Sequence, residues 1–214
     1  MTTELKFEII DVQPERYAAT PNLLFKIRLE EETGATVHAI ALRVQLKIEP
    51  QRRGYTDDEK EGLGDLFGTP DRYKDTLKPF LWTHASATVQ GFHDVTEFDL
   101  PVACTYDFDV IASKYLHTVR DGEIPVTLLF SGTVFTRGDA NGFGVDQVAW
   151  DCEASYRLPV AVWREMMDAF FPGGGWIRID RDTLDALMRY KTARALTTWE
   201  QTFEELLPAP VTSP

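Results

Sequence analysis

One run of alternating residues constrains the fold more than any other stretch of the sequence. Over residues 38–49, apolar side chains occupy every second position, and polar or small ones lie between them. A period of two is typical of a β-strand with one buried face and one face in water. Residues 23–29 repeat the pattern, and Gly34 lies between the two runs. These residues predict two neighbouring strands joined as an antiparallel hairpin.

The apolar period changes near residue 158. Before it the strong segments alternate, as in residues 147–157; after Pro159 the apolar residues recur at helical spacing. We therefore expect an α+β fold, mainly β: an antiparallel β-sandwich followed by C-terminal helices packed on it. The expected parts are a sandwich over 1–158, a helical segment over 159–207 and a disordered tail over 208–214.

Residues 50–87 interrupt the strand pattern with acidic residues, several Gly and Pro positions and a few aromatic residues. We interpret them as a long excursion from the sandwich that contains two short helical turns. Long loops in compact domains are often functional or mobile, so the excursion is a candidate surface. Further along, residues 111–119 fit either a short helix or a continued strand, and we favour the helix.

Charge and composition argue against several classes of function. The formal net charge is −12, which repels phosphate backbones and anionic membranes. The N-terminus lacks the features of a secretory signal, and no apolar stretch approaches the length of a membrane span. We expect a cytoplasmic protein that binds neither nucleic acid nor membrane. Its two cysteines, Cys104 and Cys152, are expected to be free thiols.

No familiar catalytic or metal-binding pattern occurs in the sequence. The four histidines are far apart, and no G-x-S-x-G or phosphate-loop motif is present. We therefore predict no metal, no cofactor and no catalytic residue. The alternative is a small-molecule-binding protein or enzyme with a pocket between sandwich and helices. Its candidate residues are His93, Asp94 and Cys104.

Two adjacent arginines follow the strand over 38–49. Arg52 and Arg53 could clamp a carboxylate or phosphate, or they could be the polar end of a strand that balances the acidic residues after them. We favour the second interpretation. If the protein binds a partner, the excursion offers the mixture of basic and aromatic residues that is typical of interfaces. The candidate partner-binding residues are Arg52, Arg53, Phe67, Tyr73, Phe80 and Trp82.

Longer stretches of the sequence resemble a bacterial family of unknown function across nearly the whole chain. The resemblance is carried by "HAIALRVQLKIEPQRRGY", "LGDLFGTPDRYKDTLKPFLW", "LPVACTYDFDVIASKYLHTVRDGEIPVTLLFSGTVF" and "YRLPVAVWREMMDAFFPGGGWIRI". Members of that family tend to be encoded beside high-affinity nickel–iron hydrogenases and their maturation factors. The resemblance implies a non-catalytic protein-interaction or accessory protein that assists hydrogenase assembly. Hydrogenase subunits or maturation factors are then the expected partners, and a homo-oligomer stays open.

Overall fold

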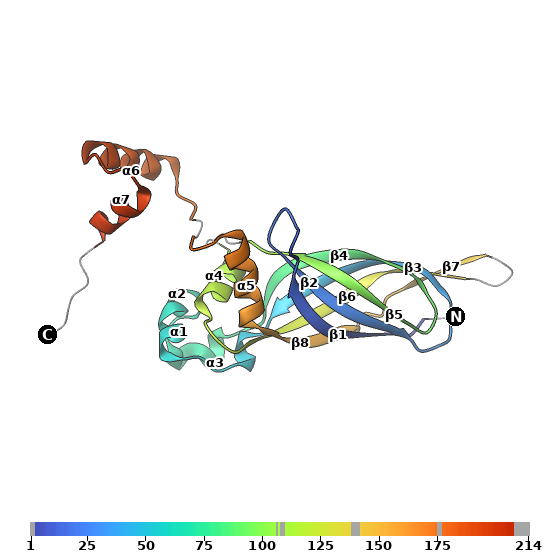
Figure 1. The fold of residues 1–214 in the computed structure, drawn as a ribbon. Coiled ribbons are helices and arrows are strands. Elements are labelled where there is room, and N and C mark those ends of the chain that lie inside the picture. The colour runs from blue at the N-terminus through green and yellow to red at the C-terminus, as the bar shows by residue number, and fades with distance from the viewer. Residues whose placement is uncertain (1–2, 106, 108–109, 138–141, 175–176, 208–214) are drawn as a thin grey trace. The chain divides into compact units, whose positions relative to one another are not determined.

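The structure is a computed structural model that describes residues 3–105, 107, 110–137, 142–174 and 177–207. The chain divides into two compact units, Met1–Trp176 and Ile177–Pro214. The first unit contains antiparallel sheets and helices, and the second contains helices (Figure 1). The mainly β character, the antiparallel pairing and the C-terminal helices are as the sequence predicts.

The first sheet has three antiparallel strands in the order β1-β2-β5. Their bounds are β1 Leu5–Pro14, β2 Asn22–Glu31 and β5 Val95–Ala103. The alternation in β2 explains its place at the centre, because Leu23, Phe25, Ile27 and Leu29 are fully buried while Lys26 and Arg28 face water.

The second sheet has β3 and β6 at its centre, with β4 beside β3, and with β7 and β8 both paired to β6. Their bounds are β3 Val37–Ile48, β4 Phe80–Phe92, β6 Glu123–Arg137, β7 Phe143–Gln147 and β8 Glu153–Pro159. The predicted hairpin of the first two alternating runs is wrong, since β2 and β3 lie in different sheets. Alternation shows that one face is buried, but it does not identify the neighbouring strand.

The apolar faces of both sheets contribute to one buried core. Phe7 of β1 stacks on Phe130 of β6 with ring centroids 4.0 Å apart. Phe25 of β2 meets Trp82 of β4 edge to face at 6.3 Å. Aromatic contacts of this kind add to the stabilisation that area burial provides. The core therefore joins the two sheets. Trp82 is half-buried and packs against this core.

The excursion after β3 folds as a chain of short helices that we call the cap, residues 50–79. Its elements are η1 Pro50–Arg52, α1 Asp57–Gly62, α2 Gly64–Phe67, η2 Pro70–Arg72 and α3 Tyr73–Thr76. Thr56 begins α1 with a capping box to Glu59. The excursion is shorter than predicted, because β4 already starts at Phe80.

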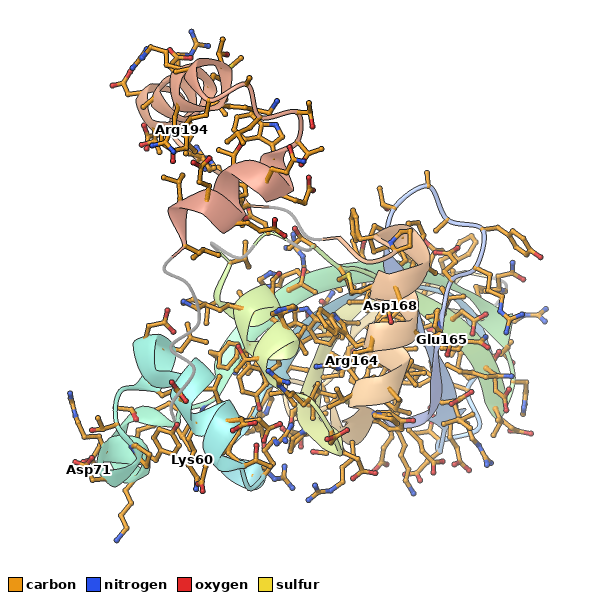
Figure 2. All side chains as sticks on the ribbon, turned by 60° about the vertical axis from the view of Figure 1, so that its left-hand side comes forward. Lys60, Asp71, Arg164, Glu165, Asp168 and Arg194 are labelled. Atoms are coloured by element: carbon orange, nitrogen blue, oxygen red, sulfur yellow. The ribbon has the colours of Figure 1, made fainter. Side chains whose placement is uncertain are left out.

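Two further helices belong to the first unit. Residues 111–118 form α4 (Ile111–Thr118), which confirms the helical interpretation of this segment. The helix α5 (Val160–Phe170) packs against β1, β2 and β8 through Val160, Trp163, Met166 and Met167. Figure 2 shows Arg164, Glu165 and Asp168 along α5. The Arg164 guanidinium donates a hydrogen bond to the Val119 carbonyl at 3.0 Å, so α5 is joined to the end of α4.

The second unit is a helical hairpin of α6 (Arg181–Ala193) and α7 (Trp199–Leu206). Asp180 and Thr198 begin these helices with the side-chain caps that their residue types favour. The predicted segment 159–207 is thus divided between the units, with α5 in the first. The packing of α6 and α7 on the sheets stays a prediction, and the predicted tail 208–214 lies outside the described residues. Among the described helices, none has the length and apolar character to cross a membrane.

Candidate partner-binding surface

A buried ion pair within the cap also forms hydrogen bonds that hold the cap on the rest of the first unit. Arg53 Nη2 donates to both carboxylate oxygens of Glu59, at 3.0 and 3.2 Å, and to the Asp121 carbonyl at 3.2 Å. The two side chains are only 10% and 2% exposed. Arg53 is a predicted partner-binding residue, and this stays a prediction. Its guanidinium is turned inward, because Glu59, which it balances, lies on the inner side of α1.

The buried Glu59 carboxylate accepts hydrogen bonds from inside and outside the cap. Besides Arg53, its donors are the backbone N–H groups of Arg120 at 2.9 Å and of Thr56 at 3.0 Å. Burial acts to raise the pKa of Glu59. The two backbone donors and Arg53 outweigh burial and hold this pKa below its ordinary value. The carboxylate is therefore ionised at neutral pH and joins α1, η1 and the segment after α4.

A cluster of aromatic rings packs beneath the same helices. The ring of Tyr115 in α4 meets those of Phe67 at 6.2 Å and Phe80 at 5.6 Å, and its hydroxyl lies 2.9 Å from that of Tyr55. Burial raises the pKa of both tyrosines, so the hydroxyls stay protonated. Phe67, a predicted partner-binding residue, is buried in this cluster, and its contact with a partner stays a prediction. Phe80 is half-buried, and its ring contacts Phe67 as well.

Arg52 lies on the outer side of η1, unlike its neighbour. Its side chain is 50% exposed, and its guanidinium donates to the Glu49 carboxylate at 2.7 Å. It lines a depression of about 270 Å³, together with Pro125, Ser155, Tyr156 and Arg157. Arg157 is also half exposed and lies 3.9 Å from Glu123. The structure thus brings together two arginines that are far apart in the sequence.

A larger depression of about 500 Å³ lies on the cap itself. It is lined by Gln51, Tyr73, Lys74, Leu77, Lys78 and Pro79. Tyr73 is half-buried; its ring contacts that of Tyr55 edge to face at 6.2 Å, and its hydroxyl donates to the Lys60 carbonyl at 3.4 Å. Tyr73 therefore forms both the floor of the depression and part of the packing beneath it. Of the six predicted partner-binding residues, Arg52 and Tyr73 line the described depressions.

Sequence reasoning missed the lysines and Arg157. No periodic signal links Lys74 and Lys78, because α3 ends at Thr76 and Lys78 lies in the segment after it. No local signal links Arg157 to Arg52, because only the pairing of β8 with β6 brings Arg157 beside Pro125.

The three pocket candidates do not come together. His93 Nδ1 lies 2.6 Å from the Asp94 carboxylate in the turn before β5, where both side chains are exposed. Cys104 follows the other end of β5, about 30 Å away for a strand of this length. Burial raises the pKa of its thiol to about 12, which disfavours the reactive thiolate. Within the described residues, no three His, Cys, Asp or Glu side chains are placed to hold a metal ion.

Comparison with solved structures gives only distant likenesses. A CARDB domain from Pyrococcus furiosus, solved in complex with di-metal ions, is 9% identical, with 74% of this chain and 93% of that chain covered at a TM-score of 0.29. A β-glucosidase from Kluyveromyces marxianus is 10% identical, with 72% of this chain but only 15% of that chain covered, at a TM-score of 0.26. These scores are too low to support an argument about function.

The comparison of sequences is more informative. No curated protein matches the chain. A family model does match, and it spans residues 2–213, which is nearly the whole sequence. The chain therefore belongs to DUF6084, a family of unknown function.

Proposed function

We propose that this chain is a non-catalytic protein-interaction or accessory protein that binds its partner through the cap. The proposal rests on the contrast between the two sides of the cap. Its inner side is fixed by the Arg53–Glu59 pair and by the Tyr55–Tyr115 contact, while basic side chains line depressions on its outer side. A surface that is ordered before binding loses less conformational entropy when a partner arrives.

The second unit, considered by itself, also has features of an interacting segment. Within α6 and α7, Thr202 is the only described residue that is buried. Apolar side chains including Leu184, Met188 and Leu206 are exposed. Exposed apolar side chains on amphipathic helices are a common means of docking to another surface. The hairpin follows a glycine-rich segment that includes Gly173 and Gly174, a composition typical of a flexible connection.

The resemblance to proteins encoded beside nickel–iron hydrogenases suggests the partner. Hydrogenase subunits and their maturation factors are the proteins that we expect the chain to bind, and assistance with hydrogenase assembly is the role that we propose. We also propose the finer description of the fold as a β-sandwich. The stacking of Phe7 on Phe130 and the contact of Phe25 with Trp82 support it, because each contact joins one sheet to the other.

The test is to purify the tagged chain gently from its native host and to determine the mass of the intact complexes. We expect a defined complex with hydrogenase subunits or maturation factors in simple stoichiometry. An Arg52→Glu variant should lose part of this complex, while Arg28→Glu, on the exposed side of β2, should keep it. A chain that carries a stoichiometric small molecule and no protein would overturn the proposal in favour of a ligand-binding protein.

A further inference from the structure

The depression of about 500 Å³ on the cap has an unusual charge for this protein. The chain carries a net charge of −12, yet the charged side chains that line this depression, Lys74 and Lys78, are both cationic. Both lysines are exposed, and neither forms an ion pair with any described residue. Asp71 and Asp75 are close in sequence but do not line the depression, and Figure 2 shows Asp71 at the tip of the cap.

Apolar residues line the same depression as the lysines, namely Tyr73, Leu77 and Pro79. Two of them are held in place, because the Leu77 N–H donates to the Tyr73 carbonyl at 3.0 Å and the Tyr73 ring packs on Tyr55. A depression lined by both cations and apolar side chains complements a ligand that carries carboxylates and an apolar side chain. A free phosphate would contact the lysines but not the apolar residues, and a metal cation would be repelled by the lysines.

A second depression lies next to the first. Gln51 lines the depression with the lysines, and the next residue, Arg52, lines the one with Arg157, so both depressions border η1. Arg52 is paired with Glu49, and Arg157 lies 3.9 Å from Glu123, so this depression adds no uncompensated charge. One glutamate near each arginine leaves further N–H donors available, however, and guanidinium groups bind carboxylates through paired hydrogen bonds.

We propose that the cap binds an acidic segment of a partner protein, with carboxylates at Lys74 and Lys78 and an apolar side chain against Tyr73, Leu77 and Pro79. This inference rests on the proposed function, since it names the chemistry of the partner at the same surface. The overall negative charge of the chain repels a long polyanion such as nucleic acid. A short acidic peptide interacts mainly with the lysines near it, because salt screens the more distant negative charges.

A peptide assay tests the inference without a known partner. The probe is a short fluorescein-labelled peptide in which glutamates flank a Phe-Leu pair, and binding is measured by fluorescence polarisation. We expect the double variant Lys74→Glu/Lys78→Glu to bind at least about tenfold more weakly, equivalent to about 1.4 kcal/mol. The matched control, Lys6→Glu/Arg28→Glu, makes the same charge change on the exposed side of β1 and β2 and should bind as the wild type does. Added salt should weaken wild-type binding.

Several outcomes would overturn the inference. Equal binding of the peptide with glutamine in place of glutamate would show that charge is not recognised, and equal loss in both double variants would show a non-specific effect. Tighter binding of a single-stranded oligonucleotide would assign the surface to nucleic acid. Self-association in sedimentation that Lys74→Glu/Lys78→Glu abolishes would assign it to a second copy of the chain.

Failure of the inference can be distinguished from failure of the proposed function. If the Lys74→Glu/Lys78→Glu variant still binds the native partner, the inference fails while the proposed function stands. If the wild type binds the peptide but captures no partner in its host, the proposed function fails instead.

Discussion

Removing Arg53 from the buried Arg53–Glu59 pair should destabilise the protein more than breaking any other ion pair described in the chain. Replacing Arg53 by Met keeps most of the apolar stem but leaves the Glu59 carboxylate, which is 2% exposed, without its cation. Removing one partner of a buried pair costs about 3–5 kcal/mol. Glu59 keeps the backbone donors of Arg120 and Thr56, so we expect a loss of about 3 kcal/mol, at the lower end of that range.

The neighbouring arginine provides the control. Arg52→Met removes an ion pair whose arginine is 50% exposed, and exposed pairs contribute less than about 1 kcal/mol. Urea unfolding followed by circular dichroism measures both losses at neutral pH, and hydrogen exchange over residues 55–67 shows whether the cap opens first. In the double variant Arg53→Met/Glu59→Gln, the loss should be smaller than the sum of the single losses by about 1–3 kcal/mol.

The destabilisation caused by Arg53→Met should depend on pH. Because the pKa of Glu59 is lowered in the folded state, its contribution is fully present above the unfolded value of about 4.3 and is lost as pH falls through the lower folded value. In the Arg53→Met variant, a buried carboxylate without its cation protonates more readily. The destabilisation should therefore be largest at pH 7 and shrink on acidification. Equal losses for the Arg52 and Arg53 variants, or a loss independent of pH, would refute the reasoning.

Three further predictions concern the core and the thiols. Phe67→Ala should lower the free energy of unfolding by about 3 kcal/mol, because Phe67 is buried against Tyr115; a loss below about 1 kcal/mol in urea unfolding would contradict its placement. Gly132→Ala should lower the melting temperature, since a Cβ there would lie 2.2 Å from the Ala41 carbonyl oxygen; an unchanged temperature would contradict this close approach. Cys104, with a pKa of about 12, should resist Ellman's reagent at pH 8 until the protein unfolds; peptide mapping that finds Cys104 modified in the folded protein would contradict the raised pKa.

The strands could be predicted from the sequence, but their partners could not. Alternation over residues 38–49 identified β3, since burial on one face leaves a local pattern of period two. The same pattern is compatible with several neighbours, so β2 and β3 were wrongly joined. The change of period near Pro159 likewise located α5, but it carried no information on the division of the chain after Trp176.

The candidate surface was only partly predictable for a related reason. Arg52 and Arg53 are adjacent and look equivalent in the sequence, yet one is exposed and the other is 10% exposed. Their difference depends on Glu59, Arg120 and Asp121, which reach Arg53 only after α1 and the segment following α4 have folded. A cluster of aromatic residues in a long excursion was interpreted as an interface, whereas Phe67 and Phe80 pack around Tyr115 of α4.

Photo-crosslinking in the native host tests the central claim most directly. A photoreactive phenylalanine analogue is placed at Gln51, which lines the depression with Lys74 and Lys78, or at Lys6, which is exposed on β1. The account predicts one dominant crosslinked protein from position 51, with an acidic segment at the site of crosslinking, and none from position 6. Equal crosslinking from both positions, or none from position 51 while the chain is expressed and folded, would contradict the claim that the cap is a partner-binding surface.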